Sequence, residues 1–451
     1  MRVLVIGLGA TGAAVVEWAL AEGHTVVVVE DQPRGESYEA RAERARDAGV
    51  EVLERPASEV LAARATTVDL VVPSPGVRPD HPATAAALAA GIPVRSEVDL
   101  AFARLRARPQ PPRLVAVTGT NGKTTVTTMV AAMCAEAGLR SSAVGNIGPP
   151  IIAATDDDAD VVVAEVSTFQ LEFTTAAFVP DVSVLLNVAQ DHIDWHDSVE
   201  AYANAKARVF AHQGPRQALV VNVDDPVAAQ LATRARARVV RCTRGAPSPG
   251  GYGVLHGELV GPAGAVAPVP AVRAPHEVDN AVAAAAASIE AGADAPAVAR
   301  VLATWQGLPH RVQLVADVGG VRYVDDSKAT NGHAAASALA GLDHVVLIAG
   351  GRDRSHDLGQ LRRFAPCLRA VVAIGEATTT VETVFEGLVP VTRAATMHDA
   401  VRTAASQART GDTVLLSPAC ASLDMYESYA ARGDDFAHEV EQLAAEREGQ
   451  A

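Results

Sequence analysis

The chain contains three lysines, and each lies in a stretch of residues that could do chemistry. Lys123 is in TGTNGKTT, Lys206 in YANAK and Lys328 in VDDSKATN. The other 35 of the 38 basic residues (38 less three) are arginines, so arginine is the general cation here. Lysine is a compact ammonium that can lose its proton and react as an amine, whereas arginine is forked and always protonated. A lysine retained in such a chain indicates a position where a guanidinium cannot serve, and the three together point to an enzyme.

The residues around Lys123 form a glycine-rich loop between a predicted strand and a predicted helix. The loop departs from the full P-loop pattern, because Val117 stands five residues before Gly122. Its working parts are present: backbone N–H groups that bind phosphates, Lys123 for the β- and γ-phosphate oxygens, and the Thr124 hydroxyl for Mg²⁺. The alternative is a turn that binds nothing. We predict an ATP site formed by Gly119, Thr120, Asn121, Gly122, Lys123, Thr124 and Thr125.

Two further strand ends carry side chains suited to bind a metal. Glu165 ends the apolar run VVVAE, where a carboxylate is costly unless it is paired or metal-bound. Because ligands collect at the carboxyl ends of strands, Glu165 and Thr124 form a sensible half-site for Mg²⁺. The run LLNVAQDHIDWH carries Asp191, His192, Asp194 and His196. These could form a zinc site, but no cysteine supports one, and a histidine here is as readily a phosphate or Mg²⁺ contact.

Lys206 lies four residues after Tyr202 on a predicted helix. One interpretation is a solvated helical lysine. In a chain that otherwise uses arginine on its surface, that interpretation weakens. An amine that must react, for example with CO₂ to form a carbamate, cannot be replaced by arginine.

The N-terminus carries a second glycine-rich loop, Gly7-Leu8-Gly9-Ala10-Thr11-Gly12, between a strand and a helix. The acidic residues Glu30 and Asp31 end the next predicted strand. This is the dinucleotide-binding pattern, and taken alone it predicts an NAD-dependent dehydrogenase. The pattern supports the diphosphate of another nucleotide just as well.

The elements that must position these residues alternate between strands and alanine-rich helices, which predicts βαβ units and parallel sheets. The proline-rich RARPQPP (106–112) indicates one domain boundary and GLPHR (307–311) a second. We predict three α/β domains: a Rossmann-like domain over 1–112, a P-loop-ATPase-like domain with a mostly parallel sheet over 113–310, and a Rossmann-like domain over 311–451. Within the second domain, Gly/Pro-rich residues 245–253 and 261–270 predict a hairpin or surface excursion before a helical run over 277–304.

Predicted strands are RVLVIG, TVVVVE and DLVVPS in the first domain, with helices over 10–22, 36–48 and 82–90. The second has strands near 114–118, 160–165, 182–187 and 218–222, and the third near 312–316, 321–325, 344–349, 369–374 and 413–416.

Composition excludes several classes of protein. The net charge of −15 argues against nucleic-acid or anionic-membrane partners, which need a basic face. No apolar run approaches the roughly 20 residues that cross a bilayer. The first residues predict a strand rather than a signal peptide, and four widely spaced cysteines favour a reducing cytoplasm over a disulfide framework. We expect a cytoplasmic monomer that acts on small molecules.

The motifs together resemble the Mur ligase family. TGTNGKTT, ExSTFQL, NVAQDHIDWH, the YxxAK helix, NVDDP, GLPHR, VDDSKATN and LLSPACASLDMY occur in that family's order over essentially the whole chain. VDDSKATN and SPACASLD are typical of the members that add D-glutamate, and the DNPR motif of the diaminopimelate- or lysine-adding members is absent. The resemblance implies three domains that bind a UDP-sugar, ATP and an amino acid. It implies an ATP-dependent ligase of cell-wall precursor synthesis that joins D-glutamate to UDP-N-acetylmuramoyl-L-alanine through an acyl phosphate.

The resemblance also implies roles for individual residues. The UDP-substrate would contact Thr11, Asp31, Ser74, Pro75, Gly76, Asn146, Ser167, Gln170 and His192. One Mg²⁺ would bind Thr124 and Glu165, and a second would bind His192 and a carbamylated Lys206. ATP would contact the loop around Lys123 with Asn280, Arg311 and Asp326, and D-glutamate would contact Lys328, Thr330, Arg354, Ser422 and Tyr429. Lys123, Glu165, His192, Lys206 and Lys328 are the expected catalytic set.

Three positions depart from the family pattern. Glu277 follows His276 where an asparagine is usual, so the adenine contact differs in detail, although Asn280 is retained. Arg354 stands where a lysine is usual and can still pair with a carboxylate. Tyr429 stands where phenylalanine is common. The rivals to the D-glutamate ligase are a ligase for another amino acid, an NAD-dependent dehydrogenase and a non-catalytic nucleotide-binding regulator.

Overall fold

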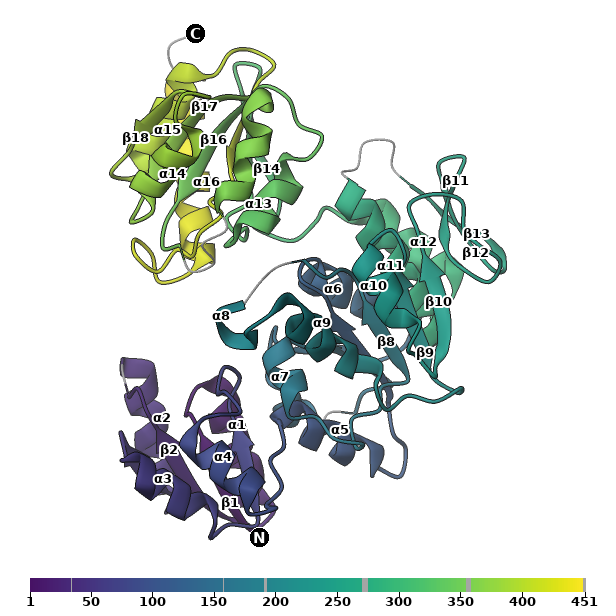
Figure 1. The fold of residues 1–451 in the computed structure, drawn as a ribbon. Helices are drawn as coiled ribbons and strands as arrows, with labels where there is room; N and C mark the ends of the chain where they lie inside the picture. The colour runs from purple at the N-terminus through teal and green to yellow at the C-terminus, as the bar shows by residue number, and fades with distance from the viewer. Residues whose placement is uncertain (34, 157, 190–192, 270–274, 354–357, 449–451) are drawn as a thin grey trace. The chain divides into compact units, whose positions relative to one another are not determined.

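The computed structural model describes residues 1–33, 35–156, 158–189, 193–269, 275–353 and 358–448 (Figure 1). The chain forms two compact units, Met1–Thr304 and Trp305–Ala451. The predicted boundaries at residues 112 and 310 stay predictions. No helix in the described part of the chain combines the length and apolar composition that crossing a bilayer requires.

The first unit begins with a four-stranded parallel sheet of order β3-β2-β1-β4. Strands and helices lie where the alternating pattern predicts them, because strands covered on both faces read as continuous apolar runs. Over residues 1–89 the structure adds one strand and one helix to that prediction, β3 and α3. The elements are β1 (Arg2–Ile6), α1 (Ala10–Ala21), β2 (Thr25–Glu30), α2 (Glu36–Asp47), β3 (Glu51–Glu54), α3 (Ser58–Ala65), β4 (Leu70–Pro73) and α4 (Pro82–Ala89).

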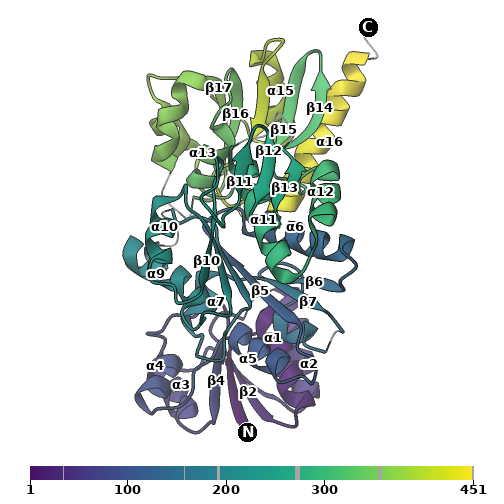
Figure 2. The same cartoon turned by 90° about the vertical axis from the view of Figure 1, so that its right-hand side faces the viewer.

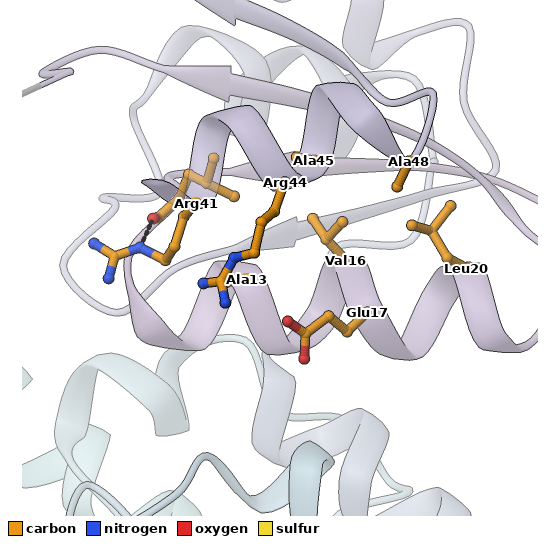
Figure 3. A pocket seen from close by; sticks show the side chains of 9 residues that line it. Ala13, Val16, Glu17, Leu20, Arg41, Arg44, Ala45 and Ala48 are labelled. Atoms are coloured by element: carbon orange, nitrogen blue, oxygen red, sulfur yellow. Dashed lines mark hydrogen bonds between the residues drawn. The ribbon is translucent and has the colours of Figure 1, made fainter. Parts of the chain in front are cut away.

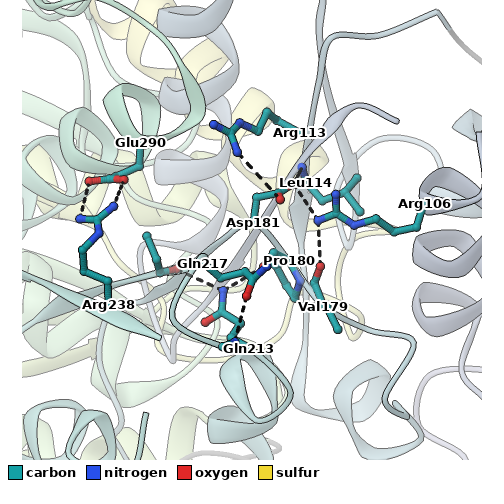
Figure 4. A network of polar contacts seen from close by, with 12 residues as sticks. Arg106, Arg113, Leu114, Val179, Pro180, Asp181, Gln213, Gln217, Arg238 and Glu290 are labelled. Atoms are coloured by element: carbon teal, nitrogen blue, oxygen red, sulfur yellow. Dashed lines mark hydrogen bonds and ion pairs between the residues drawn. The ribbon is translucent and has the colours of Figure 1, made fainter. Parts of the chain in front are cut away.

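Helix α5 (Glu97–Arg106) connects this sheet to the next one. Phe102 on α5 packs against Phe178, with ring centroids 4.4 Å apart. Arg106 pairs with Asp181 at 2.7 Å and donates to the Val179 carbonyl, while Asp181 also accepts from the Leu114 backbone (Figure 4). These contacts hold α5 to the start of the central sheet.

The central sheet has six parallel strands in the order β10-β9-β8-β5-β7-β6. Helices α6 and α11 pack together on one side of it and α9 lies on the other (Figure 2). The elements are β5 (Arg113–Thr118), α6 (Lys123–Glu136), β6 (Ser141–Gly145), η1 (Ile151–Ala154), β7 (Val161–Glu165), α7 (Thr168–Glu172), β8 (Val182–Leu185), α8 (Ile193–His196), α9 (Val199–Ala207), η2 (Arg208–Phe210), β9 (Ala218–Asn222), α10 (Pro226–Ala232) and β10 (Arg238–Cys242).

The predicted excursion is a three-stranded antiparallel sheet of β11 (Gly253–Leu255), β12 (Glu258–Gly261) and β13 (Gly264–Pro268). The single helix predicted over 277–304 is wrong. Two helices form instead, α11 (Pro275–Ala291) and α12 (Ala295–Thr304). Gly292 between them adopts φ 113°, which ends α11, and Asp294 accepts a hydrogen bond from the Ala297 backbone at the start of α12.

The second unit contains a six-stranded sheet of order β14-β15-β19-β16-β17-β18, in which β14 runs antiparallel to β15 and the other pairs are parallel. All five predicted strands are present. The elements are β14 (Gln313–Val318), β15 (Val321–Asp325), α13 (Gly332–Leu339), β16 (Val345–Gly350), η3 (Leu358–Cys367), β17 (Leu368–Ile374), α14 (Thr378–Phe385), β18 (Val391–Arg393), α15 (Met397–Gln407), β19 (Thr413–Leu416) and α16 (Tyr429–Glu448).

Candidate active site

The glycine-rich loop after β5 leads directly into α6, as the sequence predicts. Gly122 is the N-cap of α6 and has φ 83° in the left-handed region. A Cβ added there would lie 2.3 Å from Oδ1 of Asn280, so only glycine fits. This close approach places Asn280, which is buried on α11, against the loop that is predicted to bind ATP.

The conformation of this loop is fixed by the segment that follows β8. Asn187 Oδ1 accepts from the Asn121 backbone at 2.8 Å, and its Nδ2 donates to the Asn121 carbonyl at 3.1 Å. Thr120 Oγ1 accepts from the Ala189 backbone at 2.9 Å. The loop is therefore preorganised in the way that a phosphate site requires. Asn187 was not singled out by the sequence analysis, although it lies in the NVAQDH motif.

The Lys123 ammonium is half-buried and turns back onto its own loop. Its Nζ donates to the carbonyls of Gly119 and Thr120, at 3.0 and 2.9 Å. The N-terminus of α6 and this ammonium both provide positive charge at one place. An anion such as a phosphate is the ligand that this arrangement suits.

Glu165 ends β7, which pairs with β5 so that Glu165 lies beside Val117. The carboxylate is 2% exposed. Its Oε1 accepts from Asn146 Nδ2 at 2.8 Å, while its Oε2 is buried and has no hydrogen-bond partner among the described residues. An unpartnered buried carboxylate oxygen next to a phosphate loop is a suitable ligand for Mg²⁺. The residues present therefore fit the predicted Mg²⁺ half-site.

The predicted cluster after β8 is described only in part. Asp191 and His192 lie outside the described residues, and so does the side chain of Asp194. His196 is 6% exposed, and its Nε2 is 2.9 Å from Thr168 Oγ1. Its ring packs among those of Phe169, Trp195 and Tyr202, with centroids 6.0, 4.4 and 5.3 Å away. In the described part of the chain, no three His, Cys, Asp or Glu side chains lie together as the alternative zinc site would require.

Lys206 is 2% exposed on α9, so its interpretation as a solvated surface lysine is wrong. Its Nζ lies 4.2 Å from the centroid of the Tyr202 ring, one helical turn away. The Tyr202 hydroxyl is in turn 3.2 Å from Thr120 Oγ1. Lys206 is thus a buried amine connected through one tyrosine to the phosphate loop.

The N-terminal glycine-rich loop is closed against the turn after β4. A Cβ on Gly12 would lie 2.0 Å from the Gly7 carbonyl oxygen, and Ser74 Oγ donates to that oxygen at 3.0 Å. The Glu30 carboxylate accepts from the backbones of Leu8 and Gln32, at 2.7 and 2.9 Å. Glu30 is therefore used within the loop rather than presented to a ribose. Thr11 belongs to this loop and is the second residue of α1.

Other residues of the predicted UDP-substrate site also belong to the first unit. Asp31 contacts His81, with Oδ2 3.0 Å from Nε2. Ser167 and Gln170 form a reciprocal capping box at the start of α7.

A cavity of about 60 Å³ lies between α1 and α2, where Arg41 donates to the Leu8 carbonyl (Figure 3). Ligand pockets generally measure about 300–1,000 Å³, so this cavity is too small for a nucleotide.

In the second unit, Asp326 follows β15 and is buried. Ser417 Oγ donates to its Oδ2 at 2.7 Å. Burial raises the pKa of Asp326 to about 7, against smaller lowering effects from the Ser417 hydrogen bond and the charge of Arg311. The structure thus brings together Asp326 and Arg311, two of the residues expected to contact ATP.

The residues expected to contact D-glutamate lie around the carboxyl ends of β15 and β19. Lys328 Nζ is 3.7 Å from the centroid of the Tyr429 ring. Thr330 follows on the same loop, and the buried Ser422 lies after the neighbouring strand β19. Arg354 lies outside the described residues.

One buried residue of this region was missed by the sequence analysis. Arg432 is 1% exposed and donates to Ser327 Oγ, the Ser327 carbonyl and the Cys420 carbonyl. Burial lowers its pKa to about 10, so it stays charged near neutral pH. It holds the loop of Lys328 to the loop of Ser422. In a chain with 35 arginines, no sequence signal separates this one from the others.

The sequence of the chain is similar to those of known proteins over nearly its whole length. Family models match the Mur ligase MurD-like N-terminal domain over residues 1–96, the Mur ligase middle domain over 117–249 and the Mur ligase glutamate ligase domain over 310–420. The UDP-N-acetylmuramoylalanine–D-glutamate ligase of Frankia casuarinae is 43% identical over 98% of this chain and 94% of its own length. That of Thermobifida fusca is 40% identical over 98% of both chains.

Solved structures share the fold at lower identity. A MurF ligase from Thermotoga maritima in complex with ADP has a TM-score of 0.62 at 16% identity and covers 93% of this chain and 96% of its own. A pseudomurein peptide ligase type C from Methanothermus fervidus has a TM-score of 0.59 at 16% identity and covers 98% and 99%. They confirm the predicted α/β fold class. With relatives about 40% identical along nearly its whole length, the chain belongs to the Mur ligase family.

Proposed function

We propose that this chain joins D-glutamate to UDP-N-acetylmuramoyl-L-alanine in an ATP-dependent reaction of peptidoglycan precursor synthesis. The observation that carries the proposal is the preorganised loop of Lys123 beside the unpartnered buried oxygen of Glu165. That arrangement suits a nucleotide with its Mg²⁺. The choice of D-glutamate rests on relatives that are named for this reaction and match the chain from end to end.

The reaction requires an activated carboxylate, because a free carboxylate does not form an amide with an amine in water. The carboxylate of the UDP-substrate attacks the γ-phosphate of ATP, giving an acyl phosphate and ADP. The amine of D-glutamate then attacks the acyl carbon, the amide forms, and phosphate leaves. Lys123 and the loop N–H groups would stabilise the charge that develops on the transferred phosphoryl group.

Two cation sites and one modified lysine belong to this proposal. Thr124 and Glu165 would hold one Mg²⁺, and His192 with a carbamylated Lys206 would hold a second. Bound Mg²⁺ neutralises phosphate charge and orients the phosphates. The position of Lys206 supports the carbamate, because Lys206 is a buried amine linked through Tyr202 to the phosphate loop, and a carbamate supplies the anionic oxygen that a hard cation prefers.

The remaining residues would bind the three substrates. Thr11, Asp31, Ser74, Pro75, Gly76, Asn146, Ser167, Gln170 and His192 would contact the UDP-substrate. Asn280, Arg311 and Asp326 would contact ATP with the loop of Lys123. In the second unit, Lys328, Thr330, Arg354, Ser422 and Tyr429 would contact D-glutamate. We place the three domains at 1–112, 113–310 and 311–451, in a monomer that acts in the cytoplasm.

The test is ADP release with UDP-N-acetylmuramoyl-L-alanine and a panel of amino acids. We expect turnover with D-glutamate and none with L-glutamate, L-lysine or D-alanine. Lys123→Ala controls for ATP turnover at another site and is expected to be inactive. Turnover with another amino acid and not with D-glutamate would make this a different ligase. NADH binding without affinity for the UDP-substrate would favour the dehydrogenase instead.

A further inference from the structure

Three segments expected to contact the UDP-substrate come from distant parts of the first unit. They are the turn Ser74–Gly76, the start of α7 over residues 167–170, and α8 (Ile193–His196), which follows the expected contact His192 in the sequence. We propose that Trp195 is a positioning residue that joins these three segments and thereby sets the affinity for the UDP-substrate. The proposal rests on the proposed function for the identity of that substrate.

The turn after β4, over Ser74–Val77, is held by contacts on both of its halves. The Ser74 carbonyl accepts from the Val77 backbone at 3.1 Å, and Gly76 has φ 97°. Pro75 in the second position and a glycine of positive φ in the third define a type II turn. Ser74 Oγ holds the first half of the turn to the Gly7 carbonyl. The second half is held by Trp195, whose Nε1 donates to the Gly76 carbonyl at 3.0 Å.

The indole ring is itself held from the side of α7. The Trp195 centroid lies 5.0 Å from that of Phe169 in an edge-to-face arrangement, and 4.4 Å from that of His196. His196 is fixed in turn by its contact with Thr168 Oγ1. Phe169 lies between Ser167 and Gln170, two of the expected substrate contacts. The N–H of Trp195 therefore connects the turn after β4, in the N-terminal sheet, to the aromatic rings of Phe169 and His196 beside the central sheet.

A second contact joins the same two segments. Arg78, two residues after Gly76, pairs with Asp197, two residues after Trp195, at 3.2 Å. Asp197 is 79% exposed, so the ion pair contributes little by itself. Asp197 has φ 63°, which aspartate tolerates better than most residues. Arg78 and Asp197 thus form a second link between the residues that follow the turn and those that follow Trp195.

Trp195 and the pair of Arg78 and Asp197 line a cavity of about 390 Å³. Its lining includes Arg78, Trp195 and Asp197 together with Asn204 and Arg208 near α9. Because the cavity borders residues 78–80, directly after the turn, packing at this point does not by itself hold the turn. Loss of the Trp195 N–H is therefore expected to change the position of the turn.

The expected effect is confined to one substrate. The phosphate loop is anchored by Asn187 and Thr120 rather than by Trp195. The expected D-glutamate residues are all in the second unit. Removing the Trp195 N–H should weaken binding of the UDP-substrate about 3- to 10-fold, which is the range for one hydrogen bond. Binding of ATP and of D-glutamate should stay unchanged.

The experiment compares Trp195→Phe with Trp18→Phe in the full chain. Trp195→Phe keeps an aromatic ring against Phe169 and removes the N–H. Trp18 is a matched control, because its Nε1 is buried with no hydrogen-bond partner among the described residues. Calorimetry gives Kd for UDP-N-acetylmuramoyl-L-alanine, and steady-state kinetics gives KM for all three substrates. We expect only Trp195→Phe to raise Kd and KM for the UDP-substrate, with kcat and the KM values for ATP and D-glutamate unchanged.

A second measurement does not depend on the Trp195→Phe variant. In a Trp18→Phe/Trp305→Phe chain, Trp195 is the sole tryptophan. Its emission should respond to the UDP-substrate alone and not to MgATP alone. An emission that ignores the UDP-substrate, a wild-type Kd in Trp195→Phe, or an equal rise in all three KM values overturns the proposal. A wild-type chain that binds the UDP-substrate but rejects D-glutamate overturns the proposed function, while the Kd comparison still decides the role of Trp195.

Discussion

Replacing Glu97 with glutamine tests the energetics of a carboxylate buried where α5 begins. Glu97 is 1% exposed. Its Oε1 accepts from the Ile152 backbone at 2.6 Å, and its Oε2 is buried with no hydrogen-bond partner in the described part of the chain. Burial raises the pKa of Glu97 from 4.5 to about 7, against smaller lowering effects from the Ile152 and Ile151 backbones.

The sign and size of the effect follow from this pKa. Between pH 4.5 and about 7, Glu97 is protonated in the folded chain and ionised in the unfolded chain. The contribution of Glu97 to the free energy of unfolding is therefore fully present below that range and is lost as pH rises through it. At about 1.4 kcal/mol per pKa unit, the rise corresponds to about 3 kcal/mol. Glutamine resembles the protonated acid in shape and carries no charge. Glu97→Gln should therefore be about 3 kcal/mol more stable than wild type at alkaline pH and equal to it at acid pH.

The assay is urea unfolding across the pH range in a Trp305→Phe background, where the fluorescence comes from Trp18 and Trp195 in the first unit. Glu54→Gln is a control of opposite sign, because hydrogen bonds from Tyr38 and Arg46 hold the pKa of the exposed Glu54 below its ordinary value. That variant should lose stability at alkaline pH. A Glu97→Gln variant that is less stable than wild type at alkaline pH, or whose difference does not vary with pH, would refute the reasoning.

Three further predictions concern the proposed site. Glu165→Gln should lower Mg²⁺-dependent ADP release about 10²- to 10³-fold, because it removes a charged metal ligand, while the Tm without Mg²⁺ stays within a few degrees of wild type; wild-type activity would contradict the Mg²⁺ site. Lys206→Ala should lose activity that excess bicarbonate does not restore and short-chain carboxylic acids partly restore, and full activity in this variant would contradict the carbamate. Since burial raises the pKa of Asp326 to about 7, KM for ATP should fall as pH rises through that value, because the ionised carboxylate is the stronger acceptor for the hydrogen-bond donors of ATP. Asp326→Asn should remove this pH dependence, and an unchanged dependence would assign it to another group.

The buried parallel strands could be predicted from sequence because they are continuous apolar runs. The strands that escaped prediction are short or polar and lie at or near sheet edges, as in β3, β6, β10 and β18. β3 reads EVLE with both ends exposed, so its composition does not separate it from a loop. The helical run after residue 275 was predicted as one helix because its alanines continue on both sides of Gly292, and alanine composition alone does not locate a break.

The candidate site was predicted to a different degree in each part. The scarcity of lysine identified Lys206, and the four-residue spacing from Tyr202 places both side chains on one helical face, as the structure shows. The position of Glu165 at the end of a strand could also be predicted, because Glu165 ends the apolar run VVVAE. The contact between Trp195 and Gly76 joins residues 119 apart, and nothing in either local sequence indicates it. The same holds for the burial of Glu97, which looks like an ordinary acidic residue in the first turn of a helix.

The most direct measurement of the central claim is a competition between the two enantiomers of glutamate. The chain is given UDP-N-acetylmuramoyl-L-alanine, MgATP and equal amounts of deuterated D-glutamate and unlabelled L-glutamate, and the product mass is measured. The account predicts a single amide product that carries the deuterium label, formed with one ADP per product. An unlabelled product, or ADP released without any amide, would contradict it.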